Sequence, residues 1–75
     1  MDKLKLEYEM KKNDITAQKM SDILGISKSA FYRKMNQTSD FTRNEMEIII
    51  NTLHLEDPMS IFFANEVSHT TQTEG

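Results

Sequence analysis

Residues 15–36 read ITAQKMSDILGISKSAFYRKMN, and this stretch decides the fold. Thr16 can accept a hydrogen bond from a first-turn amide, so it can begin a helix that runs to about Leu24. Gly25 then interrupts the helical pattern, because glycine adopts a positive φ without a Cβ clash and lets the chain turn sharply. Ser27 can cap the following helix as Thr16 caps the first. The stretch therefore predicts two short helices joined by a tight turn.

The two predicted helices have an apolar inner face and a polar outer face. The inner face is predicted from helical spacing and consists of Met20, Ile23, Leu24, Ile26, Phe31 and Met35. On the second helix, the outer face keeps Lys28, Ser29, Tyr32 and Arg33. A helix, a glycine turn and a basic second helix form the pattern of a helix-turn-helix motif.

The rest of the chain contains signals for three further helices and none for a strand. Residues 2–12 are rich in good helix formers. Residues 42–45, Thr-Arg-Asn-Glu, form a capping box that begins a helix ending near His54. The Asp-Pro pair at residues 57–58 repeats a start signal, for a helix that continues to about Val67. We therefore expect an all-α fold, a compact bundle of five helices.

Spacing also assigns the apolar residues of the last two predicted helices. One stripe consists of Met46, Ile49, Ile50 and Leu53, and a second consists of Met59, Phe62, Phe63 and Val67. Ile48 and Ile61 lie off these stripes, and spacing leaves open whether they belong to the edge of the core or to an exposed contact surface. We expect one domain over residues 1–67 and a flexible tail over residues 68–75, which contain no apolar residue.

Composition excludes several classes of protein. The 75 residues include no cysteine, so disulfides and thiolate metal sites are excluded, and a reducing cytoplasm is the expected compartment. No apolar run approaches the roughly 20 residues of a membrane span. His54 and His69 lie far apart with no ligands at metal-binding spacing, so we expect no metal. A bundle this small leaves little room for a pocket, and we expect neither an enzyme nor a cofactor or small-molecule site.

The charge is unevenly distributed along the chain. Residues 15–36 carry four basic side chains against one acidic side chain, a net charge of +3. Residues 37–75 carry one basic side chain against seven acidic ones, a net charge of −6. Because duplex binding depends on neutralised phosphates, we expect a monomer to bind DNA weakly and with a strong salt dependence. A homodimer or a partner protein would recover affinity.

Two segments carry a family resemblance. LGISKSAFYRKMN at residues 24–36, followed by FTRNEMEIIINTLHLEDPMSIFF at residues 41–63, resembles the lambda-repressor-like Cro and CI type (XRE-type) regulators of temperate phages of Gram-positive hosts. The resemblance covers about residues 4–67 and is greatest for small Cro-type proteins and modulators of repression. It implies a five-helix bundle whose third helix lies in the DNA major groove.

The resemblance also implies which residues contact DNA. The candidates are Ser27, Lys28, Ser29, Tyr32 and Arg33, with Gln18, Lys34 and Asn36 as further contacts. Arg33 or Lys28 could donate to guanine O6 and N7, and a good bidentate contact is worth ~1–3 kcal/mol of discrimination. Gln37 stands where many family members have glycine, so we expect the left-handed turn after this helix at Asn36.

Two functional hypotheses follow. In the first, the chain regulates transcription in a phage lysis-lysogeny switch by binding operator DNA through its third helix. In the second, it is an antirepressor that binds the CI-type repressor and controls the repressor's DNA binding. The acidic second half of the chain favours the second hypothesis, because complementary charge would orient an encounter with a basic DNA-binding domain.

Overall fold

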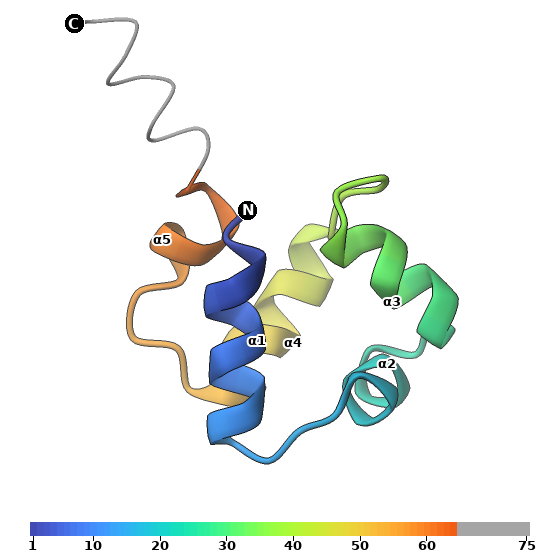
Figure 1. The fold of residues 1–75 in the computed structure, drawn as a ribbon, viewed down its shortest axis with the longest axis horizontal. Coiled ribbons are helices and arrows are strands. Elements are labelled where there is room, and N and C mark those ends of the chain that lie inside the picture. The colour runs from blue at the N-terminus through green and yellow to red at the C-terminus, as the bar shows by residue number, and fades with distance from the viewer. Residues whose placement is uncertain (65–75) are drawn as a thin grey trace, which may run out of the picture.

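A computed structural model describes residues 1–64, which contain five helices and no strand (Figure 1). The helices are α1 (Lys3–Lys12), α2 (Ala17–Leu24), α3 (Lys28–Met35), α4 (Arg43–Leu53) and α5 (Pro58–Phe62). The predicted all-α class is confirmed. Residues 65–67 of the last predicted helix and the predicted tail over residues 68–75 lie outside the described residues.

The helices pack around α1 and α4. In Figure 1, α2 and α3 lie on one side of α1 and α5 lies on the other. α2 packs against α3 and α4, and α1 packs against α5. Two hydrogen bonds tie the ends of α1 to later parts of the chain. The Asp2 N–H donates to the Ile61 carbonyl at 2.7 Å, and the Asn13 side-chain amide donates to the Leu53 carbonyl at 3.4 Å.

One apolar core joins the helices and the loop before α4. Its buried side chains within residues 1–64 are Leu6, Met10, Met20, Phe31, Met35, Phe41, Ile49, Leu53 and Ile61. The rings of Phe31 and Phe41 lie 6.0 Å apart and those of Phe41 and Phe62 lie 6.2 Å apart, measured between centroids. Since burying a side chain of this size contributes roughly 1.5–3 kcal/mol, this cluster is the main source of stability.

Two core assignments made from spacing, those of Met59 and Ile23, are corrected, and the structure places the two isoleucines that spacing left open. Met59 is 56% exposed although spacing assigns it to the apolar stripe of the last helix, and Ile61 is buried in the core. Ile23 is exposed at the edge of α2, and Ile48 is half-buried. Spacing identifies the residues that share a helix face, but the packing partners decide which face turns inward. Here the bond from the Asp2 N–H to the Ile61 carbonyl holds α5 against α1.

The helix starts follow the predicted capping residues. Thr16, Ser27 and Asp57 each accept a hydrogen bond from a first-turn N–H. The capping box at the start of α4 is complete, because Thr42 Oγ1 accepts from the Glu45 N–H at 3.1 Å and Glu45 Oε1 accepts from the Thr42 N–H at 2.8 Å. These side chains satisfy amide groups that a helix cannot satisfy itself.

The helix ends share a backbone feature that the sequence signals predicted correctly only at Gly25. α2 ends at Gly25 with φ of 73°, and the next N–H, that of Ile26, donates back to the Ser21 carbonyl at 3.0 Å. α1, α3 and α4 also end with an N–H that donates to the carbonyl five residues earlier in the chain. The left-handed residues at these three ends are Asp14, Gln37 and His54, with φ of 61°, 64° and 53°. This is the Schellman arrangement.

The expected left-handed turn at Asn36 is therefore wrong. Asn36 has φ of −88°, and Gln37 takes the left-handed conformation instead. The cause is the bond from the Thr38 N–H to the Arg33 carbonyl at 2.8 Å, which closes the end of α3 one residue later than expected.

We predict that His54→Gly stabilises the protein by about 0.5–1 kcal/mol, because glycine adopts the left-handed conformation without the Cβ clash. His54 is exposed, so little packing is lost. The measurement is the free energy of unfolding in urea at neutral pH. Asn51→Gly, at an exposed position inside α4, is the control and should lower stability.

Candidate nucleic-acid interface

The α2 and α3 pair is held together by a short turn and a small packing residue. Ser27 Oγ accepts from the Ala30 N–H at 3.0 Å and so fixes the first turn of α3. Ser21 is fully buried where α2 packs, and its Oγ donates to the Gln18 carbonyl at 2.8 Å, so this buried hydroxyl is satisfied. Phe31 and Met35 bury the inner face of α3. The outer face of α3 is thereby turned toward solvent.

The outer face of α3 carries polar and basic side chains that are free to bind a ligand. Ser27, Lys28, Ser29, Tyr32 and Arg33 are all exposed. Within residues 1–64, the side chains of Lys28, Ser29, Tyr32 and Arg33 make no hydrogen bond or ion pair to the rest of the protein. An α-helix with its side chains is about 10–12 Å across, which is comparable to the roughly 12 Å width of the DNA major groove.

Lys34 does not belong to this outer face, although it is among the predicted contacts. Its Nζ lies 2.9 Å from Glu45 Oε1 and 3.2 Å from the Asp40 carbonyl, and its side chain is only 15% exposed. It lies three positions after the buried Phe31, so the helix turns it toward α4. Lys34 therefore joins α3 to α4 instead of facing a ligand.

Two further predicted contacts are exposed but already have partners within the protein. The Gln18 side-chain amide donates to Asp22 Oδ1 at 3.0 Å along α2. Asn36 Oδ1 accepts from Lys3 Nζ at 2.7 Å, which links the end of α3 to α1. Exposed hydrogen bonds exchange readily with water, so both side chains can still be redirected toward a ligand.

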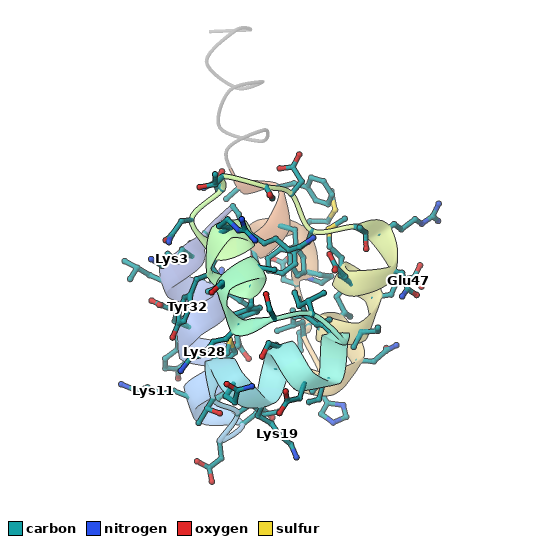
Figure 2. The ribbon with its side chains drawn as sticks, turned by 90° about the vertical axis from the view of Figure 1, so that its right-hand side faces the viewer. Lys3, Lys11, Lys19, Lys28, Tyr32 and Glu47 are labelled. Carbon is teal, nitrogen blue, oxygen red and sulfur yellow. The ribbon has the colours of Figure 1, made fainter. Side chains whose placement is uncertain are left out.

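Lysines from other helices extend the basic charge around α3. In Figure 2, Lys3 and Lys11 of α1 lie at the same edge of the molecule as Lys28 and Tyr32, while Glu47 of α4 lies at the opposite edge. The sequence analysis did not select Lys3 and Lys11, because they belong to a segment with balanced charge. No spacing along residues 1–14 distinguishes these two lysines from Lys5 and Lys12, so no local signal could have found them.

The carboxylate of Glu45 holds the end of α3 and the start of α4 together. It accepts from both the Thr42 N–H and the Lys34 ammonium, and its side chain is 11% exposed. Burial by itself would raise the pKa of Glu45, but the hydrogen bond from the Thr42 N–H and the bond and charge of Lys34 outweigh it. The pKa of Glu45 therefore lies below its ordinary value of 4.5.

Within residues 1–64, no three histidine, cysteine, aspartate or glutamate side chains lie close enough to hold a metal ion. In the same residues, no helix is long and apolar enough to cross a membrane. No protein-family model, curated protein or solved structure matches the chain. The exposed face of α3 is therefore the feature of the described residues from which we infer a function.

We predict that Glu45→Gln lowers the free energy of unfolding by about 1–2 kcal/mol at pH 7, because it leaves the half-buried Lys34 ammonium without a counterion. A carboxyl group whose pKa is lowered by folding stabilises the protein above its unfolded pKa. That contribution is lost as the pH falls through the folded value. Unfolding in urea between pH 7 and pH 3 should therefore show the variant losing less stability below about pH 4.5 than the unchanged protein.

Glu47→Gln is the matched control, since Glu47 lies on the same helix in an exposed pair 3.6 Å from Arg43. It should change stability by no more than about 0.5 kcal/mol. Equal losses from the two substitutions would contradict the role assigned to Glu45.

Proposed function

We propose that this chain is a helix-turn-helix transcription regulator that binds operator DNA through α3, like the phage-switch regulators that it resembles. One observation carries the proposal. α3 exposes Lys28, Ser29, Tyr32 and Arg33 on one face, and within residues 1–64 none of these side chains makes a hydrogen bond or an ion pair. A bacterial cytoplasm, where a phage regulator acts, is the proposed compartment.

Each side chain on this face can make a contact to a base or to a phosphate of DNA. Arg33 and Lys28 can donate to guanine O6 and N7, the commonest specific contact in the major groove. Ser29 can bond to a base or to a phosphate. Tyr32 offers a hydroxyl for a phosphate oxygen and a ring for a thymine methyl group. The face therefore combines contacts that position the protein with contacts that read sequence.

The affinity of one copy for DNA should depend steeply on salt. Lys34 is paired with Glu45 and is not available for phosphates, which removes one of the four basic side chains in residues 15–36. Lys19, Lys28 and Arg33 remain, and Lys3 of α1 lies near α3 and can add a phosphate contact (Figure 2). Each neutralised phosphate steepens the fall of log affinity with log salt concentration by roughly 0.9. The measured slope therefore gives the number of basic side chains that contact phosphates.

We predict that Arg33→Ala weakens binding to the operator by about 10- to 100-fold, the effect expected when a bidentate base contact is lost. The measurement is a gel-shift titration with DNA from a divergent phage promoter region, with circular dichroism to verify that the helices persist. Arg43→Ala is the matched control, because Arg43 is an exposed arginine that begins α4 beside Glu47. Equal binding by the Arg33 and Arg43 variants would overturn the proposal.

A second candidate function is binding to a CI-type repressor. The observation that favours it is the separation of charge in the fold, with Glu47 at the edge opposite Lys28 (Figure 2). Asp40, Glu56 and Asp57 are also exposed. A basic DNA-binding domain could dock on the surface of α4 around Glu47, and complementary charge would speed the encounter. Glu45 contributes little to it, because Lys34 neutralises its charge.

This second candidate predicts co-elution with the repressor's DNA-binding domain in gel filtration at micromolar concentrations. Reversing the exposed charge of α4 with Glu47→Lys should weaken co-elution and leave the helical spectrum unchanged. Arg33→Ala should leave it intact. Separate elution of the unchanged proteins would contradict this function without bearing on DNA binding.

A further inference from the structure

An exposed apolar surface lies beside α3, between α3 and α1. Leu4, Tyr8 and Tyr32 are 77%, 63% and 44% exposed. All three line one hollow of about 480 Å³, and the buried Phe31 and Met35 also line it. Single exposed apolar residues are ordinary, but a continuous group around a hollow is typical of an interaction site.

The charges on this surface balance. Glu7 and Lys11 line the same hollow on α1, four residues apart, with Leu4 and Tyr8 beside them. Lys12 lies on another side of Tyr8, with its Nζ 5.7 Å from the ring centroid. A carboxylate in the middle of the surface is unfavourable for DNA phosphates, and a surface without net charge gives no preference for a strongly acidic or basic partner. We call Leu4, Glu7, Tyr8 and Lys11, the exposed α1 residues that line the hollow beside α3, the α1–α3 strip.

We propose that the α1–α3 strip binds the same strip of a second copy, with the two α1 helices antiparallel. A two-fold axis across α1 reverses the order of its charges, so Glu7 faces the partner's Lys11 and Lys11 faces the partner's Glu7. The same operation places Leu4 and Tyr8 of each copy over the hollow of the other. The strip is thus complementary to itself in both charge and apolar surface.

The arrangement has a consequence for DNA binding, and this consequence rests on the proposed function although the dimer does not. In Figure 2, α3 lies toward the viewer while Lys3, Lys11 and Tyr32 lie at one edge. A two-fold axis at that edge that runs along the line of sight rotates the second copy within the plane of the picture. The α3 helix of each copy therefore still lies toward the viewer. The two α3 helices then lie on one side of the dimer, as two half-sites of one duplex require.

The interface is small, because it uses one face of a ten-residue helix and the edge of α3. Interfaces of this size give weak, transient association. We therefore expect a dimer with a dissociation constant in the micromolar range, so that operator DNA favours the dimer by binding both copies at once.

The first test is analytical ultracentrifugation of the full chain from about 5 μM to about 1 mM, which spans the expected dissociation constant. Leu4→Ser and Tyr8→Ser should each weaken dimerisation by about tenfold or more, as loss of a central apolar contact does. Met59→Ser is the matched control, since Met59 is 56% exposed on α5 and does not line the hollow. Circular dichroism checks that each variant folds.

The second test identifies the partner as another copy. Glu7→Lys and Lys11→Glu should each abolish self-association, because each places like charges opposite one another. An equimolar mixture of these two variants should associate again, since the introduced lysine of one variant then faces the introduced glutamate of the other. The unchanged Lys11 of the first variant likewise faces the unchanged Glu7 of the second, so every charge is paired. The mixture is the decisive sample. If either substitution prevented association by damaging the fold, mixing the two variants would not restore association.

Dimerisation of the unchanged chain with rescue in the mixture supports the proposal. A chain that stays monomeric up to about 1 mM overturns it, as does dimerisation that survives both charge substitutions. Neither result affects the proposed function, which Arg33→Ala tests separately. Conversely, an Arg33→Ala variant that binds DNA normally would overturn the function and leave the dimer standing.

Discussion

The carboxylate of Glu45 is the interaction on which the position of α3 depends. It completes the capping box of α4 and binds the Lys34 ammonium, so one side chain joins the end of α3, the loop and the start of α4. Lys34 also donates to the Asp40 carbonyl within that loop. In a chain this short, the burial of the core exceeds the entropy cost of folding by only a small margin. A half-buried ion pair with three additional hydrogen bonds therefore has a large share in orienting the outer face of α3.

The helix ends reveal a second constraint, which is backbone conformation. α1, α2, α3 and α4 all close in the same left-handed arrangement, yet only Gly25 is a residue that adopts it freely. Asp14, Gln37 and His54 adopt it at a cost of roughly 1–2 kcal/mol each. The core and the closing hydrogen bonds offset this cost. Such strain also makes these ends sites where the protein can gain stability without any change in fold.

Much of the candidate site could be predicted from local signals, because a cap or a turn involves only neighbouring residues. Thr16, Gly25 and Ser27 delimit the two helices as expected, and the outer residues of α3 are exposed. The exception is Lys34, which looked like part of the basic face. Its partner is eleven residues away, so no local pattern could have shown that its charge is neutralised. The basic contribution of α1 was also hidden, since a charge count along the chain ignores which helices become neighbours.

The sequence by itself determined the all-α class, the five helix starts and the composition of the exposed face of α3. These features depend on hydrogen bonds and spacing within one or two helical turns. Tertiary structure alone decided that Ile61 is buried and Met59 exposed, that Gln37 carries the left-handed turn, and that Leu4 and Tyr8 meet Tyr32 around one hollow. These outcomes depend on which helix faces pack against one another, and that is determined by the summed burial of residues far apart in the chain.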